Sequence, residues 1–471
     1  MNKKPNILLI SVDTLRADHL SCYGYPTNTS PHIDQLASEN VLFDQAYATA
    51  GWTPPSHASM FTGLYPSEHG VVNNNQLVES IPTIAQILYD DGYHTGGFVN
   101  NSQVGQLVGF DRGHETFIEV WKGHQSNNVF EKAVRYLNRQ THKLTGKYDK
   151  GAKQTNRLAL RWLDRYSKGK KPFYLFLHYI EPHNPLNPHR EHWNKQATSC
   201  FRSGINWKKI QKMAENPLRF YTDECTLNRE ETDYLISLYD GEIFYVDQII
   251  GEVINYLKMN KLYENTMIII TSDHGEHFGE KGNFSHVSSL YQPIIHIPLV
   301  VKFPYLLGEN KKISRKVQLV DILPTILDTA GVQIPSQCHI SGVNLREAIN
   351  NATPFRNHII AEWEGRIPFF ILNELGCDES DERVSRFNHK IYTIIGDSHK
   401  FIMSEDKEEL YDIVSDPLEA NDLIQEDPDT AKRLKINLLT WLDKKNSREI
   451  HHKPSIVDEE IIRNLKSLGY V

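Results

Sequence analysis

The chain has 471 residues, of which 39% are hydrophobic and 23% charged, the proportions of a globular protein. Its formal net charge of −8 argues against a general nucleic-acid or membrane-surface binder, because both partners are anionic. Five scattered cysteines with no CxxC pair argue against a disulfide framework and against cysteine-ligated zinc.

The length allows one large α/β domain and a smaller second domain. The N-terminal apolar run is about five residues long, shorter than a signal-peptide core. No apolar run approaches the roughly 20 residues that span a bilayer. We therefore expect a cytoplasmic protein without a membrane or nucleic-acid partner; the sequence does not indicate its oligomeric state.

Apolar runs and helical patterns alternate along residues 1–354. Buried strands are predicted at 6–12, 94–100, 172–180, 266–273 and 297–304. Helices are predicted between them at 32–41, 83–92 and 241–260. This alternation is typical of an α/β fold with a large, mostly parallel sheet flanked by helices, which binds ligands beyond the carboxyl ends of its strands.

The stretch ATAGWTPPSHASMFTGLYPSEHG, residues 48–70, predicts a short helix. Thr53 is a candidate N-cap, Pro54 a first helical residue, and Gly63 the stop after Ser56–Thr62. The Thr53 hydroxyl would then lie at the positive end of the helix, where an anion binds well. An ordinary capped helix is the alternative.

The pattern changes near residue 355, and we predict a small α+β domain over 355–471. Residues 389–404 predict a hairpin that turns at Gly396–Asp397, and a strand with a turn follows. Residues 429–446 form an amphipathic helical pattern. Segment 187–232 is either an insertion near the site or a solvated loop, and 143–171 suggests the exposed face of a helix.

Three predicted strands end in clusters of carboxylate and imidazole side chains. These residues are Asp13 after the first strand, His178, Glu181 and His183 in and after the third, and Asp273 and His274 after the fourth. Such groups beside a helix N-terminus suit metal-assisted ester hydrolysis.

Each residue also has a simpler explanation. Asp13 and Asp273 could close turns, and His178 lies in an apolar strand that suits a satisfied core histidine. His183 stands in a proline-rich loop and is harder to explain structurally. Their joint occurrence favours a site.

The stretches PNILLISVDTLRADHLSCYGY, TPPSHASMFTGLYPSEHGV, PFYLFLHYIEPHNP and IIITSDHGEHFGEKG occur in this order along the chain. With further matching stretches over nearly the whole length, they resemble the sulfatase family of the alkaline phosphatase superfamily. The resemblance implies an alkaline-phosphatase-like α/β fold and the cleavage of sulfate or phosphate esters.

The resemblance also implies roles for particular residues. Thr53 stands where the family keeps its nucleophile, a Cys or Ser that is oxidised to formylglycine, and it would also contact the metal. Asp13, Asp273 and His274 fall on metal-ligand positions. His183 matches a histidine that contacts the transferred group or the leaving oxygen.

The sequence departs from the family at several of these positions. His57 replaces an arginine of the nucleophile motif, Thr14 replaces a second aspartate, and Asn100 falls close to an expected lysine. His286 falls near a basic residue that helps to hold the substrate anion. We expect His57 to act in catalysis with Thr53 and His183, and the residues expected to bind the substrate are Asn100, His286 and His178.

The sequence therefore predicts a metal-dependent hydrolase of sulfuric or phosphoric esters, acting on a small-molecule or glycan ester. A threonine nucleophile favours phosphodiesters or phosphonate monoesters. An imidazole ligand favours Mn²⁺ or Zn²⁺ over Ca²⁺ or Mg²⁺. The alternatives are a true sulfatase acting on a sulfated glycan, a catalytically silent binder of anionic glycans, and a phospho-group transferase.

Overall fold

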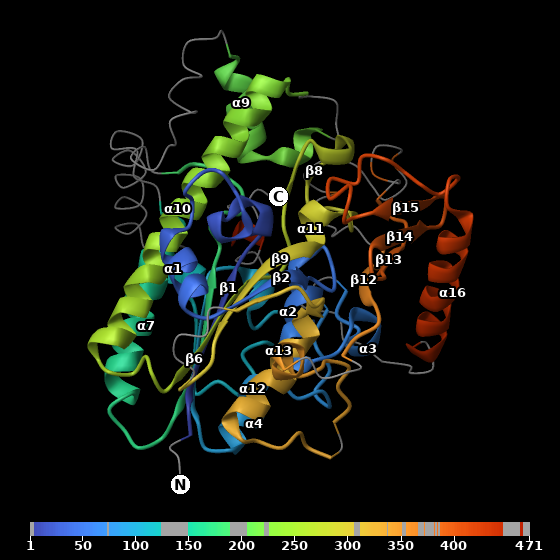
Figure 1. Cartoon of the computed structure of the whole chain (residues 1–471). Coiled ribbons are helices and arrows are strands. Elements are labelled where there is room, and N and C mark those ends of the chain that lie inside the picture. Colours follow the sequence, from blue (N-terminus) through green and yellow to red (C-terminus); the bar gives the residue numbers. More distant parts are fainter. Residues whose placement is uncertain are drawn as a thin grey trace.

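The structure is a computed structural model and describes residues 4–72, 75–123, 149–188, 205–220, 226–305, 311–336, 338–350, 355–365, 372, 381, 384, 387–445 and 462–464. Over these residues a nine-stranded sheet forms the centre of the molecule (Figure 1). Its strands are β1 (Asn6–Val12), β2 (Val41–Tyr47), β3 (His94–Val99), β4 (Thr116–Glu119), β5 (Phe173–Tyr179), β6 (Thr266–Ser272), β9 (His296–Lys302), β10 (Lys311–Ile313) and β11 (Val317–Gln318).

The sheet has the order β10-β2-β9-β6-β1-β5-β3-β4, and β11 pairs with β2. Strand β1 lies between β6 and β5 and runs parallel to both. Strand β9 is antiparallel to β6 and β2, which makes the sheet mixed but mostly parallel. The predicted fold class is confirmed.

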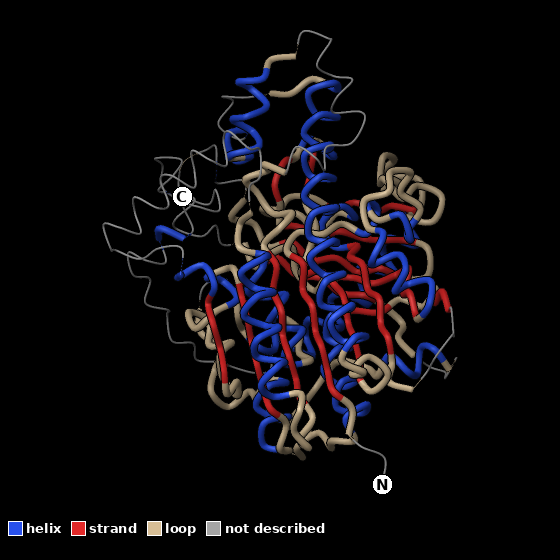
Figure 2. The backbone as a smooth tube through the Cα atoms, turned by 90° about the vertical axis from the view of Figure 1, so that its left-hand side faces the viewer, coloured by secondary structure: helices blue, strands red, loops and turns tan. Residues whose placement is uncertain are grey.

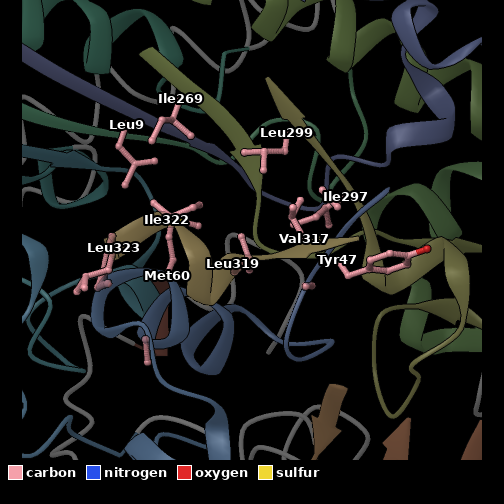
Figure 3. Packing of buried hydrophobic residues seen from close by; sticks show 14 of the residues in the cluster. Leu9, Tyr47, Met60, Ile269, Ile297, Leu299, Val317, Leu319, Ile322 and Leu323 are labelled. Atoms are coloured by element: carbon pink, nitrogen blue, oxygen red, sulfur yellow. The ribbon is translucent and has the colours of Figure 1, made fainter. Parts of the chain in front are cut away.

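Helices cover both faces of this sheet, which explains why its central strands are buried along their whole length and mostly apolar. Leu9 of β1 packs in one core with Met60 and Ile322 (Figure 3). Leu8 and Ile10 point to the other face and its separate core.

The first face is covered by α2 (Thr53–Thr62), α4 (Ile84–Asp90) and α12 (Ile322–Ala330). The second is covered by α1 (Pro31–Glu39), α7 (Ala152–Tyr166) and α10 (Arg229–Met259), which lie in front of the strands in Figure 2.

A smaller antiparallel sheet follows near the C-terminus. It consists of β12 (Ile359–Trp363), β13 (Ile391–Ile395), β14 (His399–Ser404) and β15 (Glu408–Asp412), with α16 (Pro428–Lys445) packed on it (Figure 1). The predicted hairpin with its turn at Gly396–Asp397 is the β13–β14 pair. The boundary between residues 354 and 355 stays a prediction.

Some predicted elements differ from the structure. Strand β2 was missed because Asp44 and Gln45 interrupt its apolar run, although its other residues are buried. Helix α10 begins at Arg229 rather than near residue 241. Its observed start is marked by a capping box between Asn228 and Glu231.

The structure describes part of segments 187–232 and 143–171. Within 187–232, the structure gives helix α9 (Trp207–Glu215), the 3-10 turn Pro217–Phe220 and the start of α10, whereas 189–204 and 221–225 lie outside the described residues. Within 143–171, helix α7 has an exposed face, as predicted, and buries Ala159 and Trp162 on the other. In the described ranges, no helix has the length and apolarity needed to cross a membrane.

Candidate active site

Two acidic residues meet where the central strands end. Asp13 follows β1 and Asp273 follows β6, and these strands pair in parallel up to Val12 and Ser272. Asp13, Asp273 and His274 form a fully buried group whose candidate ligand atoms lie within 4.8 Å of one another. The structure therefore brings together the three residues predicted as metal ligands.

The two carboxylates are only partly satisfied by the protein. Asp273 Oδ1 accepts hydrogen bonds from the backbone N–H groups of Thr14 (3.2 Å) and His274 (3.0 Å). Asp13 Oδ2 accepts one from Asn101 Nδ2 at 2.9 Å. Asp273 Oδ2 and Asp13 Oδ1 are buried and have no hydrogen-bond donor among the described residues. Because such orphaned oxygens are costly, they fit a bound cation.

His274 is oriented for the same purpose. Its Nδ1–H donates to the backbone oxygen of Gly275 at 3.0 Å, which leaves a lone pair on Nε2. This Nε2 lies 3.2 Å from Thr53 Oγ1 and 3.4 Å from Asp273 Oδ2. Carboxylate oxygens, an imidazole nitrogen and a hydroxyl oxygen suit a divalent metal of intermediate hardness.

The prediction that Thr53 caps its helix is wrong by one residue. Trp52 occupies the N-cap position with extended backbone, Thr53 is the first helical residue, and no side chain caps the helix. Pro54 and Pro55 have no N–H for a capping oxygen, and the N–H of Ser56 already donates to the Trp52 backbone oxygen at 3.2 Å. The helix start thus offers fewer N–H donors to an anion than predicted. Gly63 ends the helix in left-handed conformation, as expected.

His57 is buried beneath the nucleophile candidate. Its Nδ1–H donates to the Thr53 backbone oxygen at 2.9 Å, and its Nε2 lies 3.0 Å from Ser11 Oγ. Burial lowers the pKa of His57 to about 4, although Asp273 nearby opposes the shift. The imidazole is therefore neutral at pH 7 and does not supply the fixed charge of an arginine.

His178 is not the satisfied core histidine that its apolar strand suggests, whereas its predicted contact with the substrate stays a prediction. It lies on β5 beside Ser11 of β1 and is fully buried. Neither ring nitrogen has a hydrogen-bond partner among the described residues. Its Nε2 lies 3.3 Å from Asp13 Oδ2, at the predicted metal site.

Two further histidines line the same region. The His183 ring lies 5.3 Å from the His286 ring, which is 4.5 Å from the His274 ring, measured between centroids. His183 Nδ1–H donates to the backbone oxygen of Asn184 at 2.8 Å, and His286 Nδ1 lies 3.3 Å from both carboxyl oxygens of Glu276. Burial lowers the pKa of His183 to about 4 and that of His286 well below its usual value.

Asn100 contacts the main chain, and its predicted role in holding an anion stays a prediction. Its Nδ2 donates to the backbone oxygen of Lys150 at 2.5 Å, so the amide donor is directed at the main chain. The neighbouring Asn101 is the residue that contacts Asp13, and it was overlooked although it lies two residues after the end of β3.

Lys150 was also missed. Its Nζ donates to the His183 backbone oxygen at 2.6 Å and lies 3.2 Å from Glu242 Oε1. No local pattern marks this lysine as a site residue, because it approaches His183 only through the fold.

Comparison with known proteins identifies the family of the chain. A family model described as Sulfatase matches residues 5–332, and one described as N-sulphoglucosamine sulphohydrolase, C-terminal, matches residues 279–447. An N-acetylglucosamine-6-O-sulfatase of Bacteroides thetaiotaomicron is 26% identical over 89% of this chain and 83% of that protein. The uncharacterized sulfatase YidJ of Escherichia coli is 27% identical over 71% of this chain and 69% of that protein.

Solved structures show the same fold. A phosphonate monoester hydrolase of Agrobacterium radiobacter superposes with a TM-score of 0.71 at 20% identity, covering 94% of this chain and 96% of that one. BT4656, in complex with its substrate D-glucosamine-2-N,6-O-disulfate, has the same TM-score at 20% identity and covers 95% and 99%. The family model covers most of the chain, so the chain is an ester hydrolase that belongs to the metal-dependent sulfatase family.

Proposed function

We propose that this protein is a metal-dependent hydrolase of singly charged phosphorus esters, phosphodiesters or phosphonate monoesters, with Thr53 as its nucleophile. The observation that carries the proposal is the position of Thr53 Oγ1, 3.2 Å from His274 Nε2 and beside buried carboxylate oxygens that lack donors. A hydroxyl beside a bound metal can be activated by coordination to that metal, without a dedicated base.

A divalent cation held by Asp13, Asp273 and His274 would polarise the ester oxygen and lower the pKa of the Thr53 hydroxyl. Thr53 Oγ1 gives its proton to a water molecule and forms a bond to phosphorus, while the bond from phosphorus to the leaving oxygen breaks. His183, which takes up a proton from solvent at Nε2, donates it to the leaving alkoxide. A water molecule then attacks phosphorus and breaks its bond to Thr53 Oγ1, which regains a proton from that water, and the phosphorus acid leaves.

The chemistry of threonine separates it from the family's usual nucleophile. Oxidation of Thr53 would give a ketone rather than an aldehyde, because its Cβ carries a methyl group. Formylglycine therefore cannot form at this position. The direct attack of an alkoxide remains, as in transfers to and from phosphorus centres.

The charges around the site favour a substrate with one negative charge. His57 is neutral at pH 7, and Asn100 donates to the main chain rather than to an anion. Lys150 is paired with Glu242, so this buried pair contributes little net positive charge. A phosphate monoester brings nearly two charges, which such a site compensates poorly in the transition state.

A substrate panel tests the proposal. We expect the wild-type enzyme, loaded with Mn²⁺ or Zn²⁺, to cleave an aryl phosphodiester and an aryl phosphonate monoester faster than the aryl phosphate or aryl sulfate. Ca²⁺ should support less activity than Mn²⁺ or Zn²⁺. Thr53→Ala should abolish turnover, whereas Thr53→Ser, the matched control, should keep a measurable part of it. Full activity of Thr53→Ala would exclude Thr53 as the nucleophile.

Hydrolysis of a sulfated glycan is the second candidate function. It is favoured by the relative named N-acetylglucosamine-6-O-sulfatase, which aligns with most of this chain. A clear preference for sulfate esters at neutral pH, with no diester turnover in any metal, would support this function instead. A silent glycan binder would turn over none of the panel and would have no need to retain stoichiometric metal.

A further inference from the structure

His178 is an imidazole enclosed at the carboxyl end of the central sheet. It shares the α2-facing side of β5 with Phe176 and is fully buried. Neither of its ring nitrogens has a hydrogen-bond partner among the described residues. A buried polar group left in this state costs free energy, so its position needs a partner that the protein alone does not provide.

The carboxylate of Asp13 lies beside His178, and its oxygen also carries lone pairs. His178 Nε2 lies 3.3 Å from Asp13 Oδ2, but the two atoms do not meet the geometry of a hydrogen bond. The Asp13 oxygen already accepts from Asn101 Nδ2. In the tautomer with its proton on Nδ1, His178 turns the lone pair of Nε2 towards this oxygen, and the two repel each other unless a positive charge lies between them.

The same spacing recurs among the other donors of the site. Thr53 Oγ1 and His274 Nε2 are 3.2 Å apart, and His274 Nε2 and Asp273 Oδ2 are 3.4 Å apart. Ligands bound to one metal at about 2.1 Å with angles near 90–110° are separated by about 3.0–3.4 Å. The His178–Asp13 distance of 3.3 Å fits this range, although His178 Nε2 does not lie within 4.8 Å of all three ligand atoms of Asp13, Asp273 and His274, so the imidazole would move towards a bound metal.

His57, which lies nearby and is also buried, provides a contrast. Its ring centroid lies 5.3 Å from that of His178, and it is equally buried. Both of its nitrogens are engaged by the protein, with the Thr53 backbone oxygen and with Ser11 Oγ. Of these two imidazoles, only His178 has a nitrogen available to a cation.

We propose that His178 Nε2 is a further ligand of the divalent metal, which makes two imidazoles, His178 and His274, part of one coordination sphere with Asp13, Asp273 and Thr53. This inference rests on the proposed metal-dependent function. A sphere with two imidazoles favours Zn²⁺ or Mn²⁺ over Ca²⁺, because calcium prefers oxygen ligands.

The test measures metal binding rather than turnover. Zn²⁺ is added to the metal-free full-length wild type and to His178→Phe, His178→Gln and His57→Gln, and X-ray absorption counts the imidazole ligands. We expect two imidazoles in the wild type and in His57→Gln, and one in both His178 variants. In competition with a chromophoric chelator, the His178 variants should bind Zn²⁺ at least tenfold more weakly, and His57→Gln should bind it as the wild type does.

Circular dichroism and thermal unfolding of the metal-free proteins identify which variants fold, and the two His178 substitutions give separate chances of a folded protein. If a folded His178 variant retains two imidazoles and wild-type affinity, or the wild type itself shows only one imidazole, the inference is overturned while the proposed function stands. If the wild type binds neither Zn²⁺ nor Mn²⁺, the metal-dependent function fails as well.

Discussion

We expect the hydrogen bond from Asn101 to Asp13, a candidate metal ligand, to affect the affinity for the metal. The Asn101 amide donates to Asp13 Oδ2 at 2.9 Å and so fixes the direction of that carboxylate. Groups that orient a metal ligand in this way typically contribute about 10- to 100-fold in affinity. We expect Asn101→Ala to raise the Kd for Mn²⁺ or Zn²⁺ by about that factor, as measured by chelator competition.

Asn100→Ala is the matched control, since it removes the adjacent amide, which contacts the Lys150 backbone instead of Asp13. Its Kd for the metal should equal that of the wild type. Equal metal affinities of the two variants would show that the bond from Asn101 does not orient a metal ligand.

His183 allows a test of general acid catalysis that separates chemistry from folding. Burial lowers its pKa to about 4, so the acid form is scarce in the free enzyme at neutral pH, and a bound anion opposes this shift. A proton donor is needed most when the leaving alkoxide is strongly basic. We expect His183→Ala to slow kcat for an alkyl leaving group by about 10²–10⁴-fold.

For a nitrophenyl leaving group, which departs without a proton, the same His183 variant should lose much less. The ratio of the two effects is the measurement. An equal loss on both substrates would assign His183 to binding or structure rather than to proton donation.

At the level of elements, the C-terminal sheet contributes a buried ion pair that contacts the main domain. Lys400 of β14 lies 2.6 Å from Glu419, and both side chains are fully buried. Glu419 Oε2 also accepts from the backbone N–H of Gln292, at the start of α11 (Gln292–Ile295). The segment that holds His286 is thereby joined to the C-terminal sheet.

Breaking this pair should be costly, because the remaining charge stays buried without its partner. We expect Glu419→Gln to lower the free energy of unfolding by about 3–5 kcal/mol, measured by denaturant titration. The double variant Lys400→Met with Glu419→Gln should recover most of this loss, since no charge is then left in the interior. A single variant as stable as the wild type would contradict this account.

The central strands could be predicted from the sequence because both faces of the sheet are covered. Strands β1, β5, β6 and β9 consist almost entirely of apolar residues, and their predicted bounds lie within two residues of the observed ones. Strand β2 could not be predicted in this way, because Asp44 and Gln45 break its pattern and its pairing with β9 comes from residues far along the chain.

The candidate site was predictable to the extent that it consists of strand ends. Asp13, Asp273 and His274 directly follow parallel neighbours, so their proximity follows from the pairing of β1 with β6. The contact of Lys150 was not predictable, because Lys150 reaches the backbone of His183 only through the fold. The state of His178 was not predictable either, because it depends on which polar atoms the fold leaves unpaired.

At the scale of the whole molecule, the contact between the two sheets includes a carboxyl group with an unusual titration. Glu362 of β12 is buried against α3 (Pro66–His69), where it accepts from the N–H and the hydroxyl of Ser67 at 3.2 and 3.1 Å. Burial is the main cause that raises the pKa of Glu362 to about 8. The folded protein therefore keeps this group protonated at neutral pH, whereas the unfolded chain ionises it near 4.5.

This difference makes stability depend on pH in a defined direction. The contribution of protonated Glu362 is fully present below about 4.5 and is lost as the pH rises to about 8, by at most about 1.4 kcal/mol per pH unit. We expect the free energy of unfolding of Glu362→Gln, which cannot ionise, to fall less steeply between pH 5 and pH 8 than that of the wild type. Glu408→Gln, which removes a carboxylate paired with Lys435 on β15 and α16, should keep the wild-type slope. Parallel pH profiles for the wild type and Glu362→Gln would mean that Glu362 is ionised in the folded protein.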